Sequence, residues 1–257
     1  MEKQTRLNQS VEKTLQIIEA MANAREPVRL GDLAREVDMP ASTTLRMVGT
    51  LVEHRYAYQD PVTLRYALTM KFAQIGAMVS ARFSIRDIAR PTLVELSRRC
   101  DESSCLAIEE DMEVIYLDVV DGPDGMLKIT QRIGKRAPMH STGVGKLMLT
   151  QYPPARLQAL VEKKGLLRLT PHTKSTLEEL TKELDAVRAQ GYALDDEECE
   201  LGARCIAAPI RDYEGRITAA ISVSGPVSRM TRARILELVP LVTDAARRIS
   251  TALACPE

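Results

Sequence analysis

The first 68 residues constrain the fold more than any other part of the chain, because three short amphipathic segments precede a hairpin pattern there. Apolar residues recur at steps of three and four in residues 10–22, 30–37 and 43–53, which predicts three helices. Between the second and third, Pro40 disfavours helical backbone at Met39, so the chain turns there. Two helices joined by a short turn follow the plan of a helix-turn-helix motif.

The third helix is the one that would enter a DNA groove. Ser42 is its expected N-cap, as Ser10 is for the first helix. Its periodicity predicts a core side made by Leu45, Val48, Leu51 and Val52. The other side is expected to present Thr43, Thr44, Arg46, Met47 and Thr50.

A hairpin follows directly. Residues 56–68 alternate as two short strands around an Asp60-Pro61 turn, and Tyr56, Tyr58 and Tyr66 favour β structure. A hairpin in this place is a wing. The sequence therefore predicts a winged helix-turn-helix domain over residues 1–68.

The rest of the chain predicts a linker helix within residues 69–84 and a second domain over 85–257. Further helices are expected from Ser84 to about Cys100, near 143–150, and over 154–163, 176–190 and 231–253. Strands are expected in 104–110, 113–120, 127–133, 192–196, 204–210 and 216–225. Strands with helices on both sides favour one antiparallel sheet, so the fold class is α+β with two domains.

Composition narrows the function less than the motif does. Lys and Arg number 35 against 35 Asp and Glu, so the DNA-binding prediction rests on the motif and not on a basic surface. No apolar run is long enough to cross a bilayer and the N-terminus has no secretory pattern, so we expect a cytoplasmic protein without a membrane partner. The five cysteines lack metal-ligand spacing, so reduced thiols, no metal and no cofactor are expected.

Three stretches in the second half carry a more specific signal: PMHSTGVGKLML (138–149), GYALDDEECELGARCIAAPI (191–210) and AAISVSGPVSR (219–229). In this order and spacing they resemble the IclR family of bacterial transcription regulators, over essentially the whole chain. The resemblance implies a winged helix-turn-helix, a linker helix and a GAF-like or profilin-like effector domain. It also implies a homodimer or homotetramer that binds a palindromic operator in double-stranded DNA and responds to a small-molecule effector, such as an organic acid.

Candidate DNA contacts lie at the start of the third helix. Ser42, Thr43, Thr44 and Arg46 carry hydrogen-bonding groups suited to phosphates and base edges in the major groove. A cap with a solvated face is the alternative for these residues. Arg65 on the hairpin, and Lys3 and Arg6 on the N-terminal tail, are weaker candidates.

The string GVGK at 143–146 is not a phosphate loop, because His140 and Leu147 stand where that motif needs Gly and Ser or Thr. What remains is a glycine-rich start of a helix. Backbone N–H groups of Gly143 and Val144 could bind an anion such as a carboxylate. Tight packing of the backbone against the sheet explains the glycines equally well.

Ser222 and Ser224 alternate with Ile221 and Val223, so both hydroxyls lie on one face of a strand and need partners there. A ligand or local backbone groups could supply them. Through the family resemblance, the effector cavity would be lined by Met126, Ile129, Ala137, Gly143, Val144, Asp195, Cys205, Ser222 and Ser224. For Asp195 the alternative is a solvated turn, and for Cys205 a small buried apolar residue.

Two other functions stay open. An enzyme could use Cys205 as a nucleophile, but the sequence shows no histidine constellation for it and we expect no enzyme. A DNA-binding protein without a ligand is the second alternative, and it would bind random and operator DNA alike. The identity of the effector and the direction of regulation are not encoded in any recognisable motif.

Overall fold

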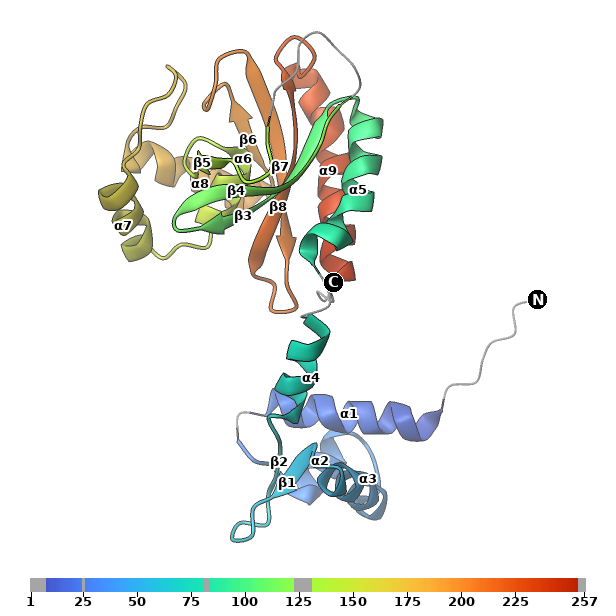
Figure 1. Ribbon diagram of the computed structural model, residues 1–257. Helices are drawn as coiled ribbons and strands as arrows, with labels where there is room; N and C mark the ends of the chain where they lie inside the picture. Colours follow the sequence, from blue (N-terminus) through green and yellow to red (C-terminus); the bar gives the residue numbers. More distant parts are fainter. Residues whose placement is uncertain (1–7, 25, 81–83, 123–130, 254–257) are drawn as a thin grey trace, which may run out of the picture. The chain divides into compact units, whose positions relative to one another are not determined.

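The computed structural model describes residues 8–24, 26–80, 84–122 and 131–253. The chain divides into two compact units, Met1–Phe83 and Ser84–Glu257 (Figure 1).

The first unit is a winged helix-turn-helix. Its elements are α1 (Gln9–Asn23), α2 (Leu30–Glu36), α3 (Ala41–Glu53), β1 (Ala57–Gln59) and β2 (Tyr66–Leu68). Ile17, Leu33 and Val48, one from each helix, are completely buried in one core with Tyr66 of the hairpin. The strands pair antiparallel, with Ala57 opposite Leu68. Three helices and a wing are confirmed.

The helix starts differ from the predicted ones. The cap of α1 is Asn8, whose Oδ1 accepts hydrogen bonds from the N–H groups of Ser10 and Val11. Helix α3 begins at Ala41, and Ser42 lies inside it without capping it. The N-cap is Pro40, which makes no side-chain cap hydrogen bond, and its carbonyl accepts the N–H groups of Thr43 and Thr44 as the first bonds of the helix.

Helix α4 (Lys71–Ser80) follows the wing. Its first residues are tied to the end of α3. Lys71 Nζ donates to the carbonyl of His54 at 2.8 Å and lies 4.1 Å from the centre of the Tyr56 ring. The Phe72 ring meets the same tyrosine edge-on, with 5.1 Å between ring centres.

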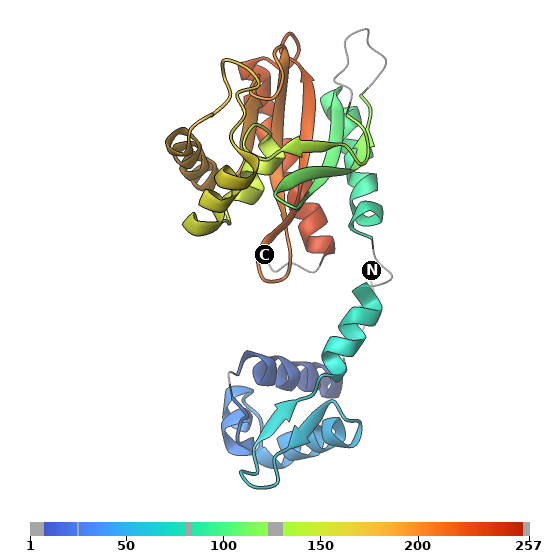
Figure 2. The ribbon, with the colours of Figure 1, turned by 60° about the vertical axis from the view of Figure 1, so that its left-hand side comes forward.

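The second unit contains a six-stranded antiparallel sheet in the order β5-β4-β3-β8-β7-β6. The strands are β3 (Ser103–Glu110), β4 (Glu113–Val120), β5 (Arg136–Pro138), β6 (Ala193–Asp196), β7 (Ala203–Arg211) and β8 (Ile217–Pro226). The helices are α5 (Ile85–Cys100), α6 (Gly143–Leu149), α7 (Pro154–Lys164), α8 (Leu177–Gln190) and α9 (Arg232–Ala252). Helices α5 and α9 cover one face of the sheet, and α6 to α8 lie on the other (Figures 1 and 2).

Strand alternation divides the side chains between two apolar layers. Ile221 and Val223 pack under α5 and α9. Ala220 and Cys105 face the layer of α6, α7 and α8. The predicted antiparallel sheet with flanking helices is confirmed, and its α6 side also carries the small and polar residues of β7 and β8.

The strand expected over residues 127–133 is not observed at residues 131–133. Residues 127–130 lie outside the described residues, and Gln131 to Ile133 have no strand structure. A turn follows instead, with Gly134 at φ 80° and its N–H bonded to the carbonyl of Tyr116 at 2.8 Å. This turn directs the chain into the short strand β5, which the sequence did not predict.

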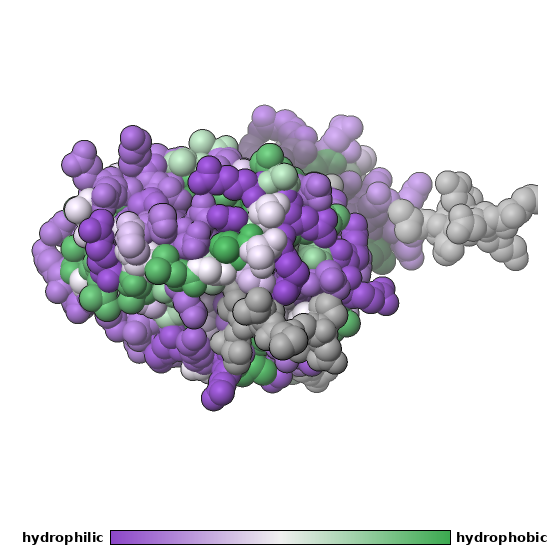
Figure 3. Space-filling model, turned by 90° about the horizontal axis from the view of Figure 1, so that it is seen from above, coloured by the Kyte–Doolittle hydropathy of each residue, from purple (hydrophilic) through white to green (hydrophobic). Residues whose placement is uncertain are grey.

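Among the described residues, no helix combines the length and apolar character needed to cross a membrane. On the side of the second unit that Figure 3 presents, hydrophilic residues cover most of the surface and apolar patches are smaller.

Candidate functional site

The exposed face of α3 differs from the predicted one. Thr44 is completely buried and its Oγ1 donates to the carbonyl of Pro40 at 3.2 Å, so in this position it cannot reach DNA. Leu45, expected in the core, is 48% exposed. The helix buries Thr44, Met47, Val48 and Leu51. This set has nearly the same spacing as the predicted one, and packing against α1 and α2 selects it.

The other candidate DNA contacts are accessible to different degrees. Ser42 and Arg46 are exposed one turn apart on α3, and Thr43 is half-buried. Arg65 is half-buried, and its guanidinium donates to the carbonyl of Pro27 at 3.3 Å. Lys3 and Arg6 lie outside the described residues.

A cavity of about 140 Å³ lies in the second unit, between the sheet and the start of α6. Its wall includes seven of the predicted effector residues: Ala137, Gly143, Val144, Asp195, Cys205, Ser222 and Ser224. Met126 and Ile129 lie outside the described residues. The structure thus brings together, in one place, residues from three distant stretches of the chain.

Two alternating serines contribute polar groups to this wall. Ser222 Oγ lies 2.9 Å from Cys105 Sγ across the neighbouring strand. Ser224 is 4% exposed, and among the described residues its Oγ has no hydrogen-bonding partner other than the thiol of Cys205. The residue opposite it on β7 is Cys205, whose thiol is a weak hydrogen-bonding group. The Ser224 hydroxyl therefore lacks a good partner within the described part of the protein.

Asp195 is held in a fixed orientation near the end of β6. Its Oδ1 accepts the backbone N–H groups of Glu198 at 2.8 Å and Cys199 at 3.2 Å. Burial raises the pKa of this carboxyl to about 7, although the two backbone donors act to lower it. The side chain therefore titrates near neutral pH, and it is not the freely solvated turn residue of the alternative prediction.

At the start of α6, packing requires a glycine at position 145 and leaves little room for a side chain at position 143. A Cβ on Gly145 would lie 2.4 Å from the Cα and carbonyl oxygen of Met139. One on Gly143 would lie 3.2 Å from the Cβ of Ala207 on the sheet. Thr142 caps the helix by accepting the N–H of Gly145. The N–H groups of Gly143 and Val144 make no hydrogen bond within the part of the chain that is described.

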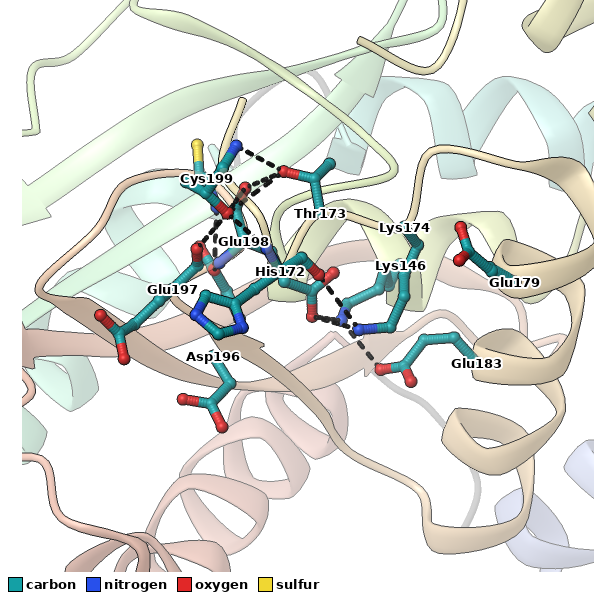
Figure 4. A network of polar contacts seen from close by, with 12 residues as sticks. Lys146, His172, Thr173, Lys174, Glu179, Glu183, Asp196, Glu197, Glu198 and Cys199 are labelled. Carbon is teal, nitrogen blue, oxygen red and sulfur yellow. Dashed lines mark hydrogen bonds and ion pairs between the residues drawn. The ribbon is translucent and has the colours of Figure 1, made fainter. Parts of the chain in front are cut away.

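A buried ionic network lies behind this wall (Figure 4). Lys146 of α6 is completely buried, and its Nζ lies 2.6 Å from Oε1 of Glu198 and 2.8 Å from Oε1 of Glu183 on α8. Burial opposes the charge, but the two carboxylates raise the pKa of Lys146 overall. The amine therefore stays charged and joins three segments of the chain.

The turn after Asp195 is also held by hydroxyl groups. Thr170 Oγ1 donates to the carbonyl of Glu197 at 2.6 Å, and Thr173 Oγ1 donates to that of Glu198 at 2.7 Å. This turn carries Cys199 and Glu200 of the cavity wall. The network and the hydroxyls together fix that wall from behind.

Sequence reasoning missed part of the site. It did not find Lys146, although a lysine within the apolar run of α6 signals a buried charge that needs partners. It also missed Tyr116, Gln131, Lys135, Arg136, Pro138, Thr142, Cys199, Glu200, Ala203 and Arg204 of the cavity wall. Six of them lie within the quoted stretches 138–149 and 191–210, where nothing local marks which side chains face the cavity, and the others have no motif of their own. They meet through the pairing of distant strands.

The thiols are not activated for catalysis. Burial raises the pKa of Cys105 and of Cys205 to about 12, which keeps both protonated. His140 hydrogen-bonds the carbonyl of Leu167 through Nε2 and does not contact the cavity. Within the described ranges, no cluster of His, Cys, Asp and Glu could hold a metal ion.

Comparison with known proteins defines the class. Residues 10–61 match the IclR helix-turn-helix domain, and residues 77–251 match the bacterial transcriptional regulator IclR C-terminal domain. The chain is 34% identical to the HTH-type transcriptional regulator XynR of Escherichia coli K12 over 248 residues, covering 96% of this chain and 98% of that protein. It is 33% identical to the HTH-type transcriptional regulator KdgR of the same organism over 250 residues, covering 97% and 94%.

The fold agrees with this match. The crystal structure of the Thermotoga maritima IclR aligns with a TM-score of 0.63 and 29% identity, covering 95% of this chain and 98% of that one. The fold and the relatives together define a DNA-binding transcription regulator. The chain belongs to the IclR family, whose matched members are regulators and not enzymes. The alternative of an enzyme using Cys205 is therefore set aside.

Proposed function

We propose that this regulator acts in the cytoplasm, binds a palindromic operator as a homodimer or dimer of dimers, and senses a small polar metabolite in the cavity of its second unit. The observation that carries the sensing function is the Ser224 hydroxyl, which is buried on the cavity wall without a good partner among the described residues. Leaving a buried hydroxyl unpaired costs about 1–3 kcal/mol. A polar ligand would remove that cost.

The chemistry of the wall suggests a small hydroxylated organic acid. A cavity of about 140 Å³ suits a small molecule, since one of about 150 Å³ accommodates benzene. Asp195 uses Oδ1 for the backbone, which leaves Oδ2 to accept a ligand hydroxyl. The N–H groups of Gly143 and Val144, unpaired within the described ranges, offer donors to a carboxylate.

Exposed apolar side chains in the first unit support association of two copies. Val11 and Leu15, one turn apart on α1, are 56% and 53% exposed. Met78 on α4 is 57% exposed, and that helix carries no charged residue after Lys71. Exposed apolar residues that lie together on one helix face, as Val11 and Leu15 do, mark association surfaces. A two-fold dimer would place two copies of α3 on the two halves of a palindrome.

The effector would regulate DNA binding through a population shift. The effector must favour one arrangement of the two DNA-binding units over another, since equal affinity for both would change nothing. Helices α4 and α5, on either side of the boundary between the units, are the segments through which this bias would pass.

A ligand screen with a matched pair of variants tests the cavity. Small carboxylates, sugar acids and aromatic acids are added to the full chain, and thermal stabilisation is measured. Ser224→Ala should raise the melting temperature of the free protein and abolish the shift given by a hit. Ser104→Ala is the control, because Ser104 Oγ donates to the carbonyl of Leu93 on the opposite face of the sheet.

Ser104→Ala should lower the melting temperature and leave the ligand shift intact. The test is completed by using fluorescence anisotropy to measure whether the same hit releases DNA. An undiminished shift in Ser224→Ala would place the ligand elsewhere. No shift with any compound, and equal affinity for selected and random DNA, would favour a ligand-independent DNA-binding protein.

A further inference from the structure

Helix α3 exposes two parallel rows of residues, each with a spacing of four. One row consists of Ser42, Arg46 and Thr50, which can donate or accept hydrogen bonds. The other consists of Ala41, Leu45 and Gly49, which cannot do so through their side chains. We call them the polar row and the apolar row. Residues four apart share a helix face, so each row lies along α3.

Leu45 is the prominent member of the apolar row. It is 48% exposed, while Thr44 and Met47 occupy the core side of the helix. In the major groove of DNA, polar groups of the base edges are read by hydrogen bonds, whereas the C5-methyl group of thymine is read by apolar contact. Residues near the start of a recognition helix approach the base edges most closely. Leu45 and Ala41 both lie there.

Gly49 provides an independent observation. It lies inside α3, where glycine destabilises a helix relative to alanine. A Cβ on Gly49 would meet nothing within 4 Å, so the fold itself does not require a glycine. Gly145 is the opposite case, since its Cβ would clash with Met139. A glycine without an internal reason, on the exposed face beside Leu45, fits the close approach of an outside molecule to the helix backbone.

We infer that the apolar row reads thymine: Leu45, supported by Ala41, packs on a thymine methyl group in each operator half-site, and Gly49 lets the groove wall approach α3. This inference rests on the proposed role of α3 as the groove-reading helix. The polar row would contact phosphates and polar base edges beside it.

The first test removes methyl groups one at a time. Binding sites are selected from random double-stranded DNA with the full chain, and each thymine of a preferred site is replaced by deoxyuridine in both half-sites. The dissociation constant is measured for the natural chain, Leu45→Ala, Leu45→Gln and Leu236→Ala. Leu236 is a matched control, because it is a 68% exposed leucine on α9.

At one or two thymine positions, replacement by deoxyuridine should raise the dissociation constant. Loss of a methyl contact should weaken binding by roughly fourfold per half-site for the natural chain and Leu236→Ala. Leu45→Ala and Leu45→Gln should bind more weakly from the start and lose less than twofold on deoxyuridine substitution. Equal sensitivity in the Leu45 variants, or no sensitive thymine, would overturn the inference. If selection yields no preferred sequence, the proposed function itself fails.

The second test uses Gly49→Ala. Because nothing within the fold opposes a Cβ there, this variant should raise the melting temperature of the first unit. The added methyl should nevertheless weaken binding to the selected site by at least fivefold. A purely structural role would change stability and DNA affinity in the same direction. A Gly49→Ala variant with higher stability and unchanged DNA affinity would overturn the inference that the groove wall lies close to Gly49.

Discussion

Lys146 Nζ lies 2.6 Å from Oε1 of Glu198, and both side chains are almost completely shielded from solvent. This ion pair joins α6, which begins at the cavity, to the turn that carries Cys199 and Glu200 of its wall. The lysine of the GVGK string therefore holds α6 to that turn inside the fold.

Replacing Lys146 by Met should destabilise the second unit by about 3–5 kcal/mol, because the buried carboxylate of Glu198 loses its nearest counter-charge and is left with Lys174 Nζ at 3.9 Å. The double variant Lys146→Met, Glu198→Gln should recover part of this loss, since it removes the uncompensated charge as well. Urea unfolding followed by circular dichroism measures both. A double variant less stable than the single one would show that the pair does not act as a unit.

Asp195 predicts a pH dependence of stability. Its pKa is about 7 in the folded protein, against 3.8 for an aspartate free in water, so between these values the folded state binds the extra proton. Stability therefore falls as pH rises across this window, by roughly 1.4 kcal/mol per pH unit from this group. Asp195→Asn lacks this contribution.

The free energy of unfolding of Asp195→Asn, minus that of the natural chain, should increase from pH 4 to pH 7 and level off above. Urea unfolding at several pH values measures this difference. A constant difference across that range would contradict the raised pKa.

The burial of Thr44 predicts a contrast between two neighbours on α3. Arg46→Ala should weaken operator binding on the order of tenfold and leave the melting temperature nearly unchanged, because Arg46 is exposed. Thr44→Val should lower stability by about 1 kcal/mol through loss of the bond to Pro40, with operator affinity kept. Thermal melts and DNA titrations of both variants provide the comparison. A loss of DNA affinity in Thr44→Val without a loss of stability would show that Thr44 does contact DNA.

Gly145→Ala should destabilise the second unit by about 1–3 kcal/mol or more, because the Met139 backbone cannot move away from a Cβ at 2.4 Å. Gly31→Ala on α2 is the control, as a Cβ there meets nothing within 4 Å. The control should be neutral or stabilising in a thermal melt. Equal effects of the two substitutions would show that α6 tolerates displacement from Met139.

Much of the fold and part of the site could be predicted from local pattern. Repeats of three and four residues predicted α1, α2 and α3, because a helix needs one apolar face to join a core. Alternation in β8 placed Ser222 and Ser224 on one face and Ile221 and Val223 on the other, because successive side chains of a strand point to opposite sides.

The tertiary structure decided what local pattern left open. Two neighbouring sets of residues on α3 satisfy the helical period almost equally, and packing against α1 and α2 buried Thr44 and exposed Leu45. The partners of Lys146 are 37 and 52 residues away in the chain. Sequence determined which residues share a helix or strand face, since that depends on backbone geometry alone. Which faces meet, and which charges become buried together, depended on the packing of distant segments.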